Sequence, residues 1–177
     1  DVAWLPGDSL LAVVGDDLTL RIWSAESGRL LAALHGHGAT VGTLAVAPDG
    51  RTLYTGDGEG TLKVWGARAT DPARTRWPTG EVAYSVALSP DGSRAVTAGW
   101  TGLVKVFDTG AGTEGASWTG HQTSAVRADW SPDGLRLVCP VEVAGHVQVT
   151  TEFLGRQPRP RALCSRRGPV LVEQRVD

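Results

Sequence analysis

Few side chains in this sequence have the type and spacing that chemistry requires. His37 and His121 could each serve as a general base or as a metal ligand. No carboxylate or thiol stands at the spacing of a metal site from either histidine. Two acidic turns are also present, but neither has the run of oxygen ligands that a calcium loop needs. Their acidic residues are Asp16, Asp17, Asp57 and Glu59. We therefore expect no bound metal.

The motifs of common enzymes are missing as well. The chain has no glycine-rich phosphate loop ending in Lys-Ser or Lys-Thr, no Gly-x-Ser-x-Gly and no His-Glu-x-x-His. Serine, histidine and aspartate residues occur, but no spacing in the sequence places them together. We expect no catalytic residue and no cofactor, so the chain is predicted not to be an enzyme.

Length and charge exclude two classes of partner. The 177 residues carry 17 Lys and Arg against 19 Asp and Glu, a formal net charge of −2. This near-neutral balance predicts no nucleic-acid partner. The longest uncharged stretch, residues 30–48, contains two histidines, three glycines and two threonines, so we expect no membrane span. The length suits one domain or a piece of one.

Amino-acid usage indicates the source and the compartment. Cys139 and Cys164 have neither the number nor the spacing of a disulfide framework, and no leader peptide is visible, so we expect a cytoplasmic location. Arginine occurs fifteen times, lysine twice and asparagine never. This bias indicates a GC-rich, bacterial genome, and it warns against treating each arginine as a phosphate ligand.

The elements that must position these residues follow an internal repeat. The tetrapeptide at positions 47–50, Ala-Pro-Asp-Gly, returns as Ser-Pro-Asp-Gly at 89–92 and at 131–134. Trp23, Trp65 and Phe107 are separated by the same 42 residues, and the pair Gly36-His37 returns at 120–121 after two such steps. Three independent markers with one period indicate a repeat architecture.

Each period contains four short strands. In the period from 37 to 78, an apolar strand is expected at 41–47, a second at 52–55, a third at 61–65 and a more polar fourth near 74–77. Pro-Asp-Gly and a glycine-rich segment form turns between them. No segment has helical periodicity, so the predicted fold class is all-β and antiparallel.

The pattern resembles the WD40 repeat, which is one four-stranded blade of a β-propeller. The matching segments are Gly36-His37, the turn at 47–50, and the third-strand motifs at 19–23, 61–65 and 104–108. The resemblance implies a WD40-type β-propeller with about four blade units, at about 1–35, 36–77, 78–119 and 120–154. An Arg-rich tail follows at 155–177, with one expected strand at 170–176.

In WD40 proteins, a hydrogen-bonded set links a histidine, a strand-two hydroxyl, an acidic turn residue and the strand-three tryptophan of each blade. The resemblance assigns this set to His37, Thr55, Glu59 and Trp65 in the second unit. The first unit keeps only Asp17 and Trp23, and the fourth keeps only His121. The role implied for these residues is to fasten the blade, and not to catalyse.

Two groups of large side chains raise separate questions. Trp100 replaces a small residue in the turn between the second and third strands, where it could anchor a partner or pack against the neighbouring blade. The equivalent positions Trp4, Val46, Leu88 and Trp130 are apolar in every unit, so we expect all four to be packed.

Closure of the ring is unresolved by the sequence. A propeller protects its strand edges by closing, and about four units are fewer than the usual number of blades. The chain could be an excerpt of a longer propeller, two copies could associate to complete a ring, or four blades could close alone. We favour the excerpt, an incomplete ring.

The expected function is a non-catalytic scaffold for protein–protein interaction, with a partner that the sequence does not identify. It could be the sensor or docking part of a larger bacterial signalling protein. The alternative is a propeller-based enzyme or a module that binds a small ligand in the central channel.

Overall fold

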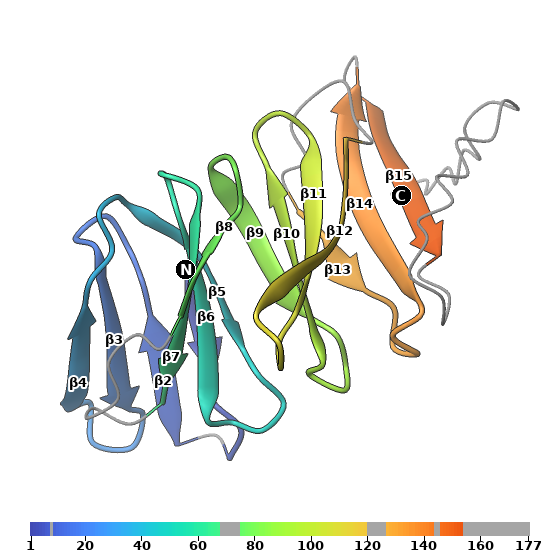
Figure 1. Cartoon of the computed structure of the whole chain (residues 1–177). Coiled ribbons are helices and arrows are strands. Elements are labelled where there is room, and N and C mark those ends of the chain that lie inside the picture. The colour runs from blue at the N-terminus through green and yellow to red at the C-terminus, as the bar shows by residue number, and fades with distance from the viewer. Residues whose placement is uncertain (8, 68–74, 120–126, 144–145, 154–177) are drawn as a thin grey trace, which may run out of the picture.

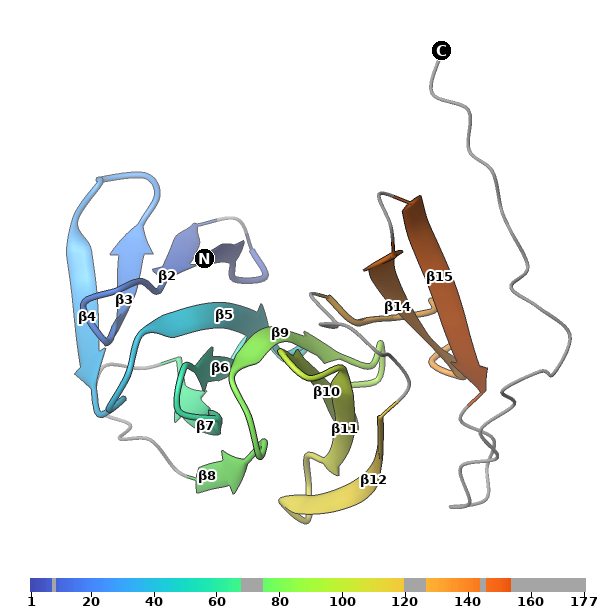
Figure 2. The ribbon, with the colours of Figure 1, turned by 90° about the horizontal axis from the view of Figure 1, so that it is seen from above.

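The computed structural model describes residues 1–7, 9–67, 75–119, 127–143 and 146–153. These residues form β-strands and turns without a helix. The strands assemble into four separate antiparallel sheets, which lie side by side in an open arc (Figures 1 and 2). The predicted all-β class and the incomplete WD40-type propeller are confirmed.

Within each sheet, the strands follow one another in chain order. The first sheet contains β1 (Val2–Trp4), β2 (Leu10–Val13), β3 (Thr19–Ser24) and β4 (Leu30–His35). The second contains β5 (Val41–Val46), β6 (Thr52–Asp57), β7 (Thr61–Gly66) and β8 (Thr75–Pro78). The third contains β9 (Ala83–Leu88), β10 (Arg94–Gly99), β11 (Leu103–Asp108) and β12 (Thr113–Thr119).

The fourth sheet has three strands in the described part of the chain. They are β13 (Asp129–Trp130), β14 (Arg136–Val143) and β15 (His146–Phe153), paired in that order. The Arg-rich tail at 155–177 and the strand expected at 170–176 lie outside the described residues, as does the site of His121.

The repeat of the sequence becomes a repeat of strand register. Leu11 pairs with Trp23 between β2 and β3, and Leu53 pairs with Trp65 between β6 and β7. Ala95 and Phe107 make the equivalent pair in the third sheet. Because side chains alternate across a strand, a common register turns equivalent residues toward the same face of every sheet.

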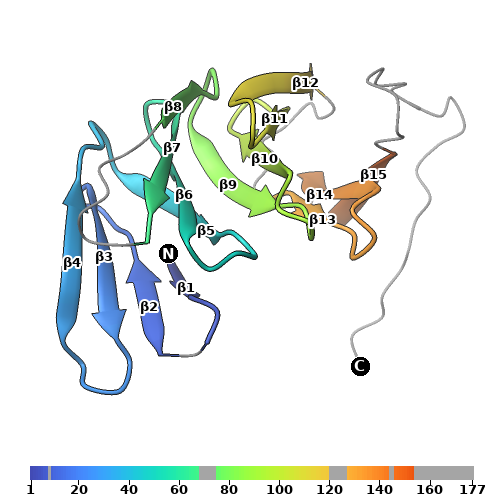
Figure 3. The same cartoon turned by 60° about the horizontal axis from the view of Figure 1, so that its bottom comes forward.

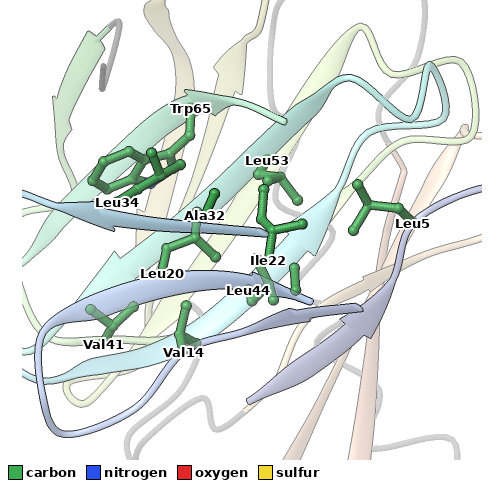
Figure 4. Close-up of a cluster of buried hydrophobic side chains, with 11 residues drawn as sticks. Leu5, Val14, Leu20, Ile22, Ala32, Leu34, Val41, Leu44, Leu53 and Trp65 are labelled. Carbon is green, nitrogen blue, oxygen red and sulfur yellow. The ribbon is translucent and has the colours of Figure 1, made fainter. Parts of the chain in front are cut away.

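The first strands of the sheets line the inner side of the arc. Figure 3 shows β1, β5, β9 and β13 following one another, each beside the first strand of the next sheet. Successive sheets therefore pack face to face, and the apolar cores lie between them. Figure 4 shows the core between the first two sheets, where Leu20 and Ile22 meet Leu53 and Trp65.

The Pro-Asp-Gly turns form a second line of contacts between sheets. Gly50 and Gly92 have φ values of 63° and 70°, a backbone region that glycine adopts without the strain a side chain would bring. A methyl group on Gly50 would lie 3.2 Å from the Pro6 ring, and one on Gly92 would lie 3.2 Å from Pro48. Gly134 faces Pro90 in the same way. Glycine therefore suits this turn position for two reasons. It adopts the positive φ, and it leaves room for the proline ring of the preceding turn.

Candidate functional site

The best-connected polar cluster fastens the second sheet. His37 lies in the loop between β4 and β5, Thr55 and Asp57 lie on β6, and Trp65 lies on β7. The His37 ring is 2.7 Å from Asp57 through Nδ1 and 2.6 Å from the Thr55 hydroxyl through Nε2. Trp65 Nε1 donates to the same hydroxyl at 2.7 Å. These bonds join the β4–β5 loop to strands β6 and β7.

A neutral His37 satisfies every member of this cluster. The Trp65 N–H donates to Thr55, the Thr55 hydroxyl donates to Nε2, and Nδ1–H donates to the Asp57 carboxylate. The second Asp57 oxygen accepts the backbone N–H groups of Glu59 and Thr61. Burial lowers the pKa of His37 from its ordinary value, and this outweighs the opposing effect of Asp57. A second proton would leave the Thr55 hydroxyl facing donors on both sides.

The hydroxyl, imidazole and carboxylate have the connectivity of a catalytic triad, but the surroundings do not allow that chemistry. All four side chains are buried, and Thr55 has no exposed surface. Because the Thr55 oxygen is fully buried, no substrate carbonyl can reach it. The arrangement can therefore hold strands together, and it gives no support to nucleophilic catalysis.

The acidic member of the cluster differs from the expected residue. The resemblance assigned this role to Glu59, whereas Asp57 makes the bond to His37. Asp57 is the last residue of β6, so its short side chain reaches the imidazole directly. Glu59 lies in the following turn, where its backbone N–H donates to Asp57. The signal that could have identified Asp57 is its position next to the second strand, two residues after Thr55.

Among its described residues, the first unit has no such cluster. The Asp17 carboxylate forms an ion pair with Arg21 and accepts the Thr19 N–H at 3.3 Å. Trp23 is only partly buried and pairs across the strands with Leu11. Val13 stands where Thr55 stands in the second unit, so no hydroxyl is available to it. The structure therefore does not join the two expected residues Asp17 and Trp23.

A buried lysine that the sequence analysis missed supports the same loop. Lys63 is 3% exposed, and its ammonium donates to the Gly36 carbonyl and lies 5.9 Å from the centre of the Trp65 ring. Burial lowers the pKa of Lys63. The equivalent Lys105 contacts the Pro78 carbonyl, equivalent to that of Gly36, at 3.5 Å. The sequence did carry a signal for this role. The chain has only two lysines, and both lie in the middle of a third-strand motif.

Trp100 forms a different kind of site, on the surface. It lies in the turn between β10 and β11 and is 62% exposed. Its ring lies 6.0 Å from the half-exposed Tyr84 ring, tilted by 58°. The Glu81 carboxylate accepts the backbone N–H groups of Thr101 at 2.6 Å and Leu103 at 3.1 Å, which fixes the turn. Trp100 is therefore not buried against the described residues of a neighbouring sheet.

The inner side of the arc encloses a hollow of about 760 Å³ lined by the first strands. Its charged residues are Asp1, Arg127 and Asp129. Both Asp1 oxygens already accept backbone N–H groups, from Val2 and Leu44. Across the described residues, no group of three or more His, Cys, Asp or Glu side chains could hold a metal ion.

Comparison with known proteins identifies the repeat. A family model described as "WD domain, G-beta repeat" matches residues 1–24, 28–66 and 75–108. These segments lie in the first three sheets. A search of curated proteins finds no match. In the described part of the chain, no helix is long and apolar enough to cross a membrane.

Proposed function

This chain belongs to the WD40 repeat family, and we propose that it acts as a non-catalytic scaffold that captures a partner protein around Trp100. WD40 repeats generally serve as scaffolds for protein interaction. The observation that carries the proposal is the exposed, fixed Trp100 beside Tyr84. This pair is named the aromatic pair below.

The physical properties of the aromatic pair suit an anchor. Tryptophan and tyrosine supply large contact areas at a small cost in conformational entropy, and they are enriched among residues that dominate binding. Glu81 already holds the turn, so little ordering free energy remains to be spent when a partner binds. Exposed large side chains on a fixed turn are typical of an interaction site.

We propose further that the scaffold is the docking part of a larger bacterial signalling protein in the cytoplasm. The arginine-rich, asparagine-free composition supports the bacterial source. The alternative use, binding of a small ligand, is favoured by one observation, the hollow on the inner side of the arc. A ligand bound in this hollow would reduce the solvent accessibility of Arg127 and Asp129. Its affinity would be unchanged by substitution of Trp100.

The test is capture of proteins from a lysate of the source cells by the immobilised chain. A Trp100→Ala variant should lose the captured partner, whereas Leu31→Ala should retain it. Leu31 is a matched control because it is another exposed apolar side chain, 51% accessible, in the first sheet. Equal capture by both variants and the parent chain would reject the aromatic pair as the docking site.

A further inference from the structure

The fourth unit departs from the repeat on the inner side of the arc. Positions 45 and 87, one period apart, are alanine, and the next period places Asp129 there. Positions 43 and 85 are the small hydroxyl residues Thr43 and Ser85, and the next period places Arg127 there. Each hydroxyl accepts a backbone N–H of the following sheet, at 3.0 and 3.2 Å. The fourth unit has therefore replaced two small residues with two opposite charges.

The two charged side chains share one face of the chain. Arg127 and Asp129 are exposed, whereas Ala128 and Trp130 are buried. This alternation is that of an extended strand, so the two charges lie about 7 Å apart along the same face. Both residues line the hollow on the inner side of the arc. We call them the charged pair.

Neither charge is neutralised within the part of the chain that the structure describes. Arg127 makes no hydrogen bond or ion pair with another described residue. Asp129 Oδ1 accepts the Trp130 N–H at 2.8 Å, while no described residue donates to Oδ2. Asp1, the other acid of the hollow, has both carboxylate oxygens occupied by backbone N–H groups. One guanidinium and one carboxylate oxygen therefore face the hollow ready for a partner.

The charged pair is continuous with the aromatic pair. Tyr84 lines the same hollow as the charged pair, and its ring lies 6.0 Å from that of Trp100, which is outside the hollow. Both aromatic residues are also departures from the repeat, because the positions one period earlier are Gly42 and Gly58. β9 and β13, which bring the two pairs together, are neighbouring first strands (Figure 3). Four departures thus lie on one surface.

Two hydrogen bonds between the sheets give the order of these groups. The Ser85 hydroxyl accepts the Ala128 N–H at 3.2 Å. Two residues further along both strands, the Trp130 indole N–H donates to the Ala87 carbonyl at 3.4 Å. The strands therefore run in the same direction. Tyr84 and the basic member of the charged pair come just before the first bond, and the acidic member comes after it. The order along the surface is aromatic pair, base, acid.

We propose that the aromatic pair and the charged pair form one docking surface for an extended peptide segment of the partner. Along one face, this segment carries an apolar, an acidic and a basic side chain in that order, the last two separated by one residue. The apolar side chain packs on the aromatic pair, the acid accepts from Arg127, and the base donates to Asp129. Alternate side chains of an extended peptide have the same spacing of about 7 Å as the charged pair. This inference rests on the proposed function and specifies the chemistry of the partner.

The two charges and the position of Trp100 favour this occupant over others. A guanidinium binds a carboxylate through two parallel hydrogen bonds. A nucleic acid would bring further negative charge against Asp129, which is unfavourable. A small ligand would fit the hollow of about 760 Å³ but would not extend to Trp100, which is outside it. An extended segment contacts both.

The test measures binding of labelled synthetic peptides to the full chain by fluorescence anisotropy. Each peptide has capped ends, serine spacers, and a leucine placed two or four residues from a pair of charges, and each is made in both chain directions. The order Leu, Glu, Lys should bind about threefold to tenfold more tightly than Leu, Lys, Glu or the uncharged Leu, Gln, Gln, because two exposed ion pairs each add a small factor. Equal affinity for all of these peptides would overturn the proposal.

Reversal of the charged pair is the sharpest form of the test. Arg127→Glu combined with Asp129→Lys should invert the preferred order, so that Leu, Lys, Glu binds more tightly. The matched control is Glu26→Lys combined with Arg29→Glu, which makes the same exchange of charges on an exposed turn of the first sheet and should leave the preference unchanged. Arg127→Gln combined with Asp129→Asn guards against misfolding and should remove the preference. A preference that survives in both variants of the charged pair would overturn the proposal.

Failure of this inference and failure of the proposed function give different results. Trp100→Ala should weaken binding of every leucine peptide and also abolish capture from the lysate. If capture depends on Trp100 but the peptides show no preferred order of charges, the proposed function stands and the charged pair is not part of its site. If Trp100→Ala changes neither capture nor peptide affinity while the preferred order persists, the occupant is confined to the hollow, and both proposals fail.

Discussion

The Thr55 hydroxyl offers a sharp test of the fastening cluster. Thr55→Val keeps the shape of the side chain but removes the oxygen that joins His37 to Trp65. Both partners are buried, so neither gains water when the hydroxyl is lost. Each buried polar group left without its partner costs about 1–3 kcal/mol, and two groups lose theirs, so we expect a loss of about 2–6 kcal/mol in the free energy of unfolding.

The third unit provides the matched control. Thr97 is buried at the equivalent position, but Phe107 replaces the tryptophan and Thr79 replaces the histidine. Its hydroxyl therefore has neither of the partners that Thr55 has. Thr97→Val should change the free energy of unfolding by less than about 1 kcal/mol, because it removes a hydroxyl without orphaning a histidine or an indole.

The measurement is urea unfolding followed by circular dichroism and tryptophan fluorescence. For a domain of this size, at about 2–4 °C per kcal/mol, the expected loss lowers the melting temperature of Thr55→Val by roughly 4–24 °C. In both variants, the dependence of the free energy of unfolding on urea concentration should equal that of the parent chain, because the surface exposed on unfolding is unchanged. If Thr55→Val and Thr97→Val lose the same free energy, the cluster contributes no more than an ordinary buried hydroxyl, and the reasoning fails.

Three further predictions concern single features of the second and third sheets. Trp77 Nε1 is buried without a partner among the described residues, whereas Trp65 Nε1 donates to a hydroxyl, so Trp65→Phe should cost about 1 kcal/mol more than Trp77→Phe in denaturant unfolding. Because burial lowers the pKa of His37 below 6.5, the unfolded state takes up its proton first. Stability should be complete above pH 6.5 and fall below it by up to about 1.4 kcal/mol per pH unit, a dependence that His37→Gln should flatten in melts at several pH values. Gly92→Ala places a side chain at φ 70° and 3.2 Å from the preceding turn's proline, so it should cost about 1–2 kcal/mol, while Gly15→Ala, with open space and no left-handed φ, should be near neutral in the same thermal assay.

The sequence was sufficient for features that depend on near neighbours in the chain. The 42-residue period, the Pro-Asp-Gly turns and the alternation of apolar residues predicted antiparallel strands close to the observed ones. The second strand of the second unit, expected at 52–55, extends from Thr52 to Asp57. Turn geometry and strand alternation are local properties, so a single sequence carries them.

Only the tertiary structure decided which polar groups meet and which apolar faces are covered. Asp57, and not Glu59, bonds to His37. The reason is that β6 ends at Asp57, which places the Asp57 carboxylate within hydrogen-bonding distance of the imidazole. Trp4 and Trp130 occupy the same position in the repeat, yet one is exposed and the other buried. Equivalent residues share a register, but their burial is set by the neighbouring sheet, and a sequence pattern within one unit does not contain that neighbour.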